Sequence, residues 1–210
     1  CFSRTLAGNE APDMLTLPAK LRRKKQPYLS VRSQLARRNL RRQAVLFYSE
    51  LRDFMAARSI VDAGPGFMRY LAVSRDGELD MEFGYLTPRI YAGGGPVRSG
   101  VLPSGTFMRA EWIGPYEKLP EVNAMLPGWA QHNGVELDVV TTDGGMVYGC
   151  RLEIFHVSPK HTDDPERFRT EIAVLTRSGT EGSAAERMVQ PGEDNAASFS
   201  HLPIGNWRNE

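Results

Sequence analysis

The fold is decided by Arg151-Leu-Glu-Ile-Phe-His156 and Arg169-Thr-Glu-Ile-Ala-Val-Leu175, two stretches separated by a short loop. Both alternate with a period of two, which is typical of β-strands. Each also carries a glutamate in mid-strand, Glu153 in the first and Glu171 in the second. A carboxylate flanked by isoleucine must be solvated, paired with a cation or held for a ligand, because burying it alone is costly.

The composition is that of an ordinary globular domain. The 210 residues are 41% hydrophobic and 24% charged, and the net charge is +1, so no overall field favours nucleic acid or an anionic membrane. No apolar run approaches the roughly 20 residues of a membrane span. Cys1 and Cys150 are too few for a disulfide framework or a four-thiolate zinc site. We therefore expect a single cytoplasmic domain that does not contact membranes.

One order of elements occurs twice along the chain. Period-two alternation predicts a strand, spacings of three and four predict a helix, and two further strands follow. We predict the first set at residues 26–35, 39–59, 67–74 and 79–86, and the second at 106–113, 114–132, 148–157 and 168–176. Residues 88–103, between the sets, are predicted to be a loop or a frayed edge. The sequence thus predicts an α+β fold made of duplicated βαββ units.

The predicted organisation has three segments. Residues 1–24 read as a flexible basic leader, and 25–176 as the folded domain with repeats at 28–86 and 106–176. Residues 177–210 contain few apolar side chains and are predicted to be a disordered tail.

The repeat suggests where the polar strand residues lie. Superposing the two copies aligns Tyr70 with Glu153 and Glu82 with Glu171. One helix per unit covers one face of its sheet, and we expect Leu152/Ile154 and Ile172/Val174 beneath the helices. The faces without a helix would then carry aromatic and acidic side chains, namely Tyr28, Tyr70, Glu82, Trp112, Glu153, Phe155 and Glu171. Two such faces predict a cleft for flat or cationic organic molecules.

A series of short motifs occurs in a fixed order along residues 64–172. They are Gly64-Pro-Gly-Phe67, Arg69-Tyr70, Leu79-Asp-Met-Glu-Phe-Gly84, Leu102-Pro-Ser-Gly105, Gly114-Pro-Tyr-Glu-Lys-Leu119, Glu153-Ile-Phe155, Asp164-Pro165 and Thr170-Glu-Ile172. In this order and spacing the chain resembles the GyrI-like family of small-molecule-binding domains over roughly residues 25–176. The resemblance implies a duplicated βαββ (SHS2-type) fold with a ligand cleft between its halves.

The resemblance also implies a set of functions and residues. The family supplies effector-binding domains of AraC- and MerR-type multidrug-responsive regulators, stand-alone sequestering proteins, and hydrolases that open cyclopropane-bearing DNA-alkylating natural products. The pocket acid would be Glu153 or Glu171, and the wall candidates are Tyr70, Tyr116 and Trp129. Phe155 stands where the family often has tyrosine, which removes a hydroxyl group.

Each of these residues also has a purely structural interpretation. Glu153 and Glu171 would equally serve as ion-pair partners of Arg151 and Arg169. Glu82 fits a solvated face, Trp129 fits the buried stripe of the second helix, and Tyr116 fits local packing at that helix's entrance.

Our first hypothesis is a stand-alone protein that binds small aromatic or cationic molecules for sensing or sequestration. The alternative is a hydrolase of strained-ring genotoxic compounds, in which Glu153 or Glu171 acts as general acid or base. A sensor domain of a transcription regulator is the third. Direct nucleic-acid contact is not expected, because the basic segment at 20–42 has no helix–turn–helix pattern. No cofactor is expected, and the histidines lack metal-ligand spacing.

Overall fold

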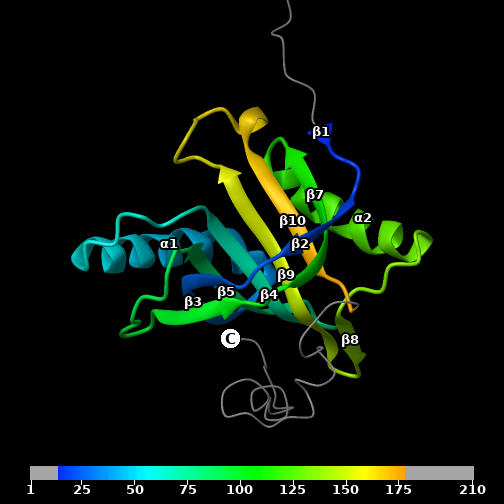
Figure 1. Cartoon of the computed structure of the whole chain (residues 1–210), viewed down its shortest axis with the longest axis horizontal. Coiled ribbons are helices and arrows are strands. Elements are labelled where there is room, and N and C mark those ends of the chain that lie inside the picture. Colours follow the sequence, from blue (N-terminus) through cyan, green and yellow to red (C-terminus); the bar gives the residue numbers. More distant parts are fainter. Residues whose placement is uncertain (1–13, 178–210) are drawn as a thin grey trace, which may run out of the picture.

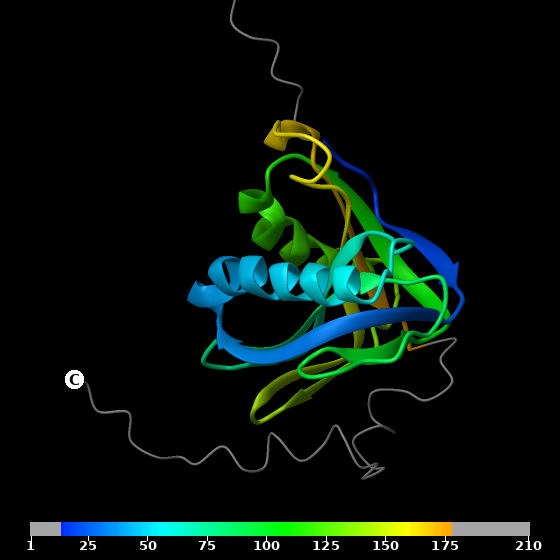
Figure 2. The same cartoon turned by 90° about the vertical axis from the view of Figure 1, so that its left-hand side faces the viewer.

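The computed structural model describes residues 14–177, and the predictions for residues 1–13 and 178–210 lie outside the described residues. The described chain forms a ten-stranded antiparallel sheet with two α-helices on one side, as Figures 1 and 2 show. No helix in residues 14–177 is long and apolar enough to cross a membrane.

The two βαββ units are confirmed. The first consists of β3 (Gln26–Ala36), α1 (Leu40–Ala57), β4 (Gly66–Ser74) and β5 (Glu78–Leu86). The second consists of β7 (Gly105–Ile113), α2 (Leu119–His132), β9 (Gly145–Val157) and β10 (Arg169–Leu175). The strand order is β7-β10-β9-β4-β5-β3, so matching strands lie equally far from the central β4–β9 pair.

Four short strands were not predicted. They are β1 (Met14–Leu15) and β2 (Ala19–Arg23), which pair with β7, β6 (Arg98–Leu102), which pairs with β3, and β8 (Val139–Thr142), which pairs with β9. Three single-turn helices complete the elements: η1 (Arg37–Asn39), η2 (Tyr116–Lys118) and η3 (Pro165–Arg167). Residues 14–23 therefore contribute strands, which corrects the flexible leader predicted there. The domain boundaries otherwise stay a prediction.

The register of β9 against β10 corrects the predicted faces. Glu153 lies opposite Ile172, and Glu171 lies opposite Ile154. Opposed residues on neighbouring strands point to the same face of a sheet. Ile172 packs beneath α2, whereas Ile154 packs on the other face. The two glutamates thus point to opposite faces, and Leu152 and Ile154 are not beneath a helix as we predicted.

The other predicted cleft residues divide in the same way. Tyr70, Trp112 and Phe155 join Glu153 on the helix-covered face, contrary to prediction. Tyr28 and Glu82 lie with Glu171 on the helix-free face. The superposition of the repeats is consistent with this, since Tyr70 shares a face with Glu153 and Glu82 shares one with Glu171.

The helix-free face is buried as well. It carries a core that includes Phe67, Phe107, Leu152 and Ile154, all nearly inaccessible to solvent. The N-terminal arm, which we define as residues 14–25, pairs with β7 and then crosses this face to begin β3 (Figure 1). The sheet therefore has a hydrophobic core on both sides, with helices over one and the arm across the other.

Gly84 in β5 is required by close packing within this second core. A Cβ atom at this position would lie 2.5 Å from the carbonyl oxygen of Leu29 and 2.6 Å from the ring of Phe67. We expect Gly84→Ala to lower the free energy of unfolding by about 1–3 kcal/mol, because both neighbours are held in the sheet. Gly128→Ala is the control, since a Cβ there in α2 meets nothing within 4 Å. Urea unfolding checks both, and equal stabilities would contradict the packing argument.

Candidate functional site

Glu153 is the centre of the candidate site. It points from β9 toward the helices and is 4% exposed. The Tyr70 hydroxyl donates a hydrogen bond of 2.9 Å to its Oε1 atom, and the Asn123 amide donates one of 2.8 Å to the same oxygen. Tyr70 comes from β4 and Asn123 from α2, so both units of the repeat hold one carboxyl group.

Arg151 extends this network on the same face of β9. Its guanidinium donates to Asn123 Oδ1 and to the Tyr148 hydroxyl, both at 3.0 Å. The guanidinium carbon also lies 4.4 Å from the centre of the Tyr70 ring, a cation–π distance. The arginine thereby orients both groups that donate to Glu153.

Burial and hydrogen bonding act in opposite directions on Glu153. Burial raises the pKa of its carboxyl group, while the Tyr70 hydrogen bond and the Arg151 charge lower it, and burial prevails. The site therefore favours the neutral acid more than water does. A cation placed beside it would stabilise the carboxylate and lower that pKa again.

Tyrosines from three elements lie near the carboxyl group. Burial raises the pKa of Tyr48, Tyr70 and Tyr116, and the nearby charge of Glu153 raises each of them further. These residues come from α1, β4 and η2. The Phe155 ring links two of them, with its centre 5.4 Å from that of Tyr116 and 6.5 Å from that of Tyr48. Glu153 therefore lies among aromatic side chains, and the region that they form is called the Glu153 enclosure below.

Trp112 and Trp129, the two tryptophans named as candidates, both lie in the core beneath α2, which is the structural interpretation given for Trp129. Trp112 is buried beneath α2, and its indole nitrogen donates a 3.0 Å hydrogen bond to the Pro115 carbonyl. Trp129 is half-buried and packs against the same cluster. Both are core residues of the second unit.

The other two glutamates are paired on the helix-free face. Glu82 accepts hydrogen bonds from Tyr28 and Arg69 at 3.0 Å and from Ser30 at 3.3 Å. Glu171 accepts from Arg23 and lies 3.2 Å from the His156 ring nitrogen. Burial raises the pKa of Glu171, but the His156 hydrogen bond and the Arg23 charge outweigh it, so the net pKa is lowered.

Sequence reasoning missed Tyr48, Asn123 and Arg151 as parts of the site. Tyr48 had a signal, because it continues the helical stripe formed by Ala44, Leu51 and Met55 and is the one residue there with a polar tip. Asn123 lies beside the buried stripe of α2, and only the fold brings it over β9. Arg151 was considered only as a partner of Glu153.

Solved structures share this fold. The EcmrR C-terminal domain matches with a TM-score of 0.57 and 16% identity over 77% of this chain and 97% of that one. SAV2435 bound to tetraphenylphosphonium matches with a TM-score of 0.52 and 9% identity over 78% of this chain and 95% of that one. EcmrR in its DNA complex matches with a TM-score of 0.56 and 16% identity over 76% of this chain, which spans only 57% of the EcmrR chain.

No protein-family model matches the sequence, and no curated protein matches it. The shared fold agrees with the architecture that the motifs imply: the chain has the fold of the GyrI-like effector-binding domains.

Proposed function

We propose that this protein binds small organic cations bearing aromatic groups, with Glu153 as the countercharge. The observation that carries the proposal is a buried carboxyl group that accepts a hydrogen bond from Tyr70 and lies near enough to Tyr48 and Tyr116 for its charge to raise the pKa of both. The structure of SAV2435, which has the same fold, is bound to tetraphenylphosphonium, a cation of this class.

The chemistry of the enclosure selects for charge and shape together. A delocalised cation loses little hydration when buried, and the faces of aromatic rings attract it. The carboxylate that forms beside it supplies charge pairing in a medium of low dielectric constant. A neutral aromatic molecule would gain only the ring contacts, and an anion would gain no charge pairing from Glu153.

Access to Glu153 involves the two helical units. Asn123 from α2 donates a hydrogen bond to the carboxyl group, and Tyr48 from α1 and Tyr116 from η2 lie near it. A bound cation would replace the Asn123 contact and leave the Tyr70 hydrogen bond in place. Sensing would then consist of a change in how the two helices pack over the sheet.

Hydrolysis of strained-ring compounds, with Glu153 or Glu171 as general acid or base, is less well supported. Glu153 and Glu171 lie on opposite faces of the sheet, and Glu171 is held by Arg23 and His156. Glu153 alone would have to provide all acid–base chemistry at the enclosure. Binding for sensing or sequestration accounts for the arrangement without a second catalytic group.

A matched pair of ions tests the proposal. Tetraphenylphosphonium should raise the unfolding temperature of the protein in a concentration-dependent way, because a ligand at about 100 times its dissociation constant adds about 2.7 kcal/mol to the stability of the folded state. Tetraphenylborate has nearly the same shape and the opposite charge, and it should have no such effect. Equal stabilisation by both ions, or none by either, would contradict a cation site at Glu153.

A further inference from the structure

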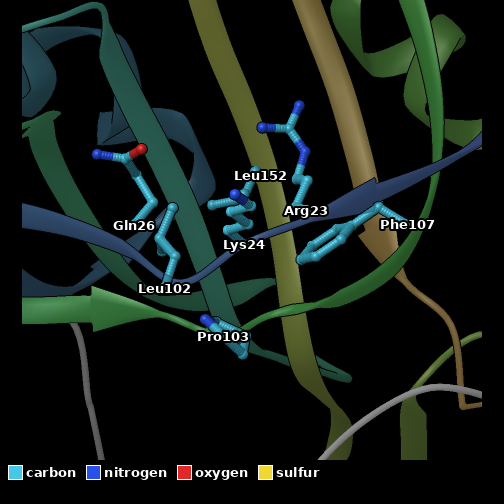
Figure 3. A pocket seen from close by; sticks show the side chains of 7 residues that line it. All are labelled: Arg23, Lys24, Gln26, Leu102, Pro103, Phe107 and Leu152. Carbon is cyan, nitrogen blue, oxygen red and sulfur yellow. The ribbon is translucent and has the colours of Figure 1, made fainter.

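Two hollows lie on the helix-free face, where the N-terminal arm joins β3. The smaller has a volume of about 140 Å³, and Figure 3 shows the side chains that line it. The larger and more open one has a volume of about 590 Å³. Both are lined by Arg23 and Lys24, so they adjoin, and Glu153 lines neither.

The smaller hollow has an apolar wall, opposite the polar side chains of Arg23, Lys24 and Gln26. Leu102, Phe107 and Leu152 line it and are almost fully buried, and Pro103 closes one end. In Figure 3 the Phe107 ring and Leu102 lie on opposite sides of the group. An apolar cavity of about this size in a protein core holds a benzene molecule. One aromatic ring is thus the group that this volume accommodates.

The larger hollow is basic. Four consecutive cationic residues, Arg22 to Lys25, line it together with Ser104, and no acidic residue lines either hollow. Arg23 directs one guanidinium nitrogen to Glu171, while its Nε atom is buried and has no hydrogen-bond partner among residues 14–177. A buried donor without a partner is unfavourable, and an anionic acceptor would satisfy it.

We propose that the two hollows form a second ligand site, which takes a small aromatic carboxylate. The ring occupies the smaller hollow beside Leu102 and Pro103, above the buried Phe107 and Leu152, and the carboxylate lies beside Lys24 and Arg23. The site prefers the opposite charge to the enclosure at Glu153 and lies across the sheet from it. The proposal of this second site does not rest on the cation site at Glu153, so an experiment can contradict either proposal without contradicting the other.

Benzoate is the probe. Titrated into the full chain, it should produce saturable shifts of the backbone amide signals of Leu102, Phe107 and Leu152 in nuclear magnetic resonance spectra, whereas benzylamine, with the same ring and a positive charge, should not. Lys24→Glu should weaken benzoate binding by about tenfold or more, because it replaces an attractive charge with a repulsive one. Lys20→Glu makes the same change on β2 at a residue that lines neither hollow, and should alter the affinity by less than about twofold.

Three results would overturn the proposal: no saturable shifts with benzoate, equal binding of benzylamine, or equal weakening by the two lysine variants. Unfolding temperatures of both variants check that the arm remains folded. If Lys24→Glu unfolds the arm, Lys24→Gln repeats the comparison with Lys20→Gln. Glu153→Gln should leave benzoate affinity unchanged, which separates this site from the cation site.

Discussion

Glu171→Gln is expected to lower the free energy of unfolding by about 3 kcal/mol near neutral pH, the lower end of what breaking a buried ion pair costs. Glu171 is 4% exposed and pairs with Arg23, whose side chain is also largely covered. The amide would leave the Arg23 guanidinium without its countercharge and His156 without its acceptor. Because Arg23 ends β2, the loss should also loosen the N-terminal arm from the helix-free face.

The loss of stability caused by Glu171→Gln should become smaller as pH falls. The folded-state pKa of Glu171 is lowered, so its contribution is present above the unfolded-state pKa and is lost as pH falls through the folded-state pKa. The stability difference between wild type and Glu171→Gln should therefore shrink in acid. Urea unfolding at neutral and acidic pH measures it.

Glu117→Gln is the matched control for Glu171→Gln. Glu117 pairs with Arg41, but both side chains are exposed, and such pairs contribute about 0–1 kcal/mol. Equal destabilisation by the two variants would contradict the anchoring role of Glu171.

Glu153→Gln is expected to raise the free energy of unfolding, whereas Glu171→Gln lowers it. The same Glu153→Gln change should remove cation binding. The glutamine amide has nearly the same shape as the carboxyl group, and its oxygen can accept the hydrogen bonds from Tyr70 and Asn123. Unlike the carboxyl group, the amide never ionises. Removing one charge of a buried pair costs several kcal/mol of binding energy, so affinity for tetraphenylphosphonium should fall by about 100-fold.

The stability of this variant should also follow pH. Burial raises the folded-state pKa of Glu153, so the contribution of its carboxyl group is fully present below the unfolded-state pKa and is lost as pH rises through the folded-state pKa. Glu153→Gln should accordingly gain stability relative to wild type as pH rises. Thermal unfolding over that range checks it, and a variant that loses stability relative to wild type with rising pH would contradict the assignment.

Local patterns in the sequence were sufficient to predict the repeated units. The strands and helices of both units have clear periodicity, and the observed α1 and α2 lie within the predicted ranges. The strand β6 was missed because Gly100 weakens its pattern. A Cβ atom there would lie 2.2 Å from the Tyr28 ring, so the glycine is required by packing between strands. The arm was missed because β2 is mostly charged and its pairing with β7 joins distant parts of the chain.

The faces were assigned wrongly for a physical reason. Alternation shows which residues share a face, but it identifies the covered face only when the other is exposed to water. In β10 every residue after Arg169 is buried, because the sheet has a core on both sides. The apolar side of β9 was therefore taken for the helix side. The pairing of Glu171 with Arg23 could not be predicted from local sequence patterns either, because the two residues are 148 positions apart in the chain.

The candidate site could be predicted in part. Glu153, Tyr70, Tyr116 and Phe155 were all named from the sequence, and the structure brings them together. Trp112 and Trp129 were named but belong to the core beneath α2. Deciding between the two glutamates required the strand register, which depends on contacts that no local pattern contains.

The most direct test of the account is calorimetric titration of tetraphenylphosphonium into wild type, Glu153→Gln and Glu171→Gln under identical conditions, with folding of each variant confirmed first. We predict that affinity falls by about 100-fold in Glu153→Gln and changes by less than about twofold in Glu171→Gln, because only Glu153 lies beneath the helices. Equal affinity in wild type and Glu153→Gln, or an equal loss in both variants, would contradict the claim that Glu153 is the countercharge of the ligand site.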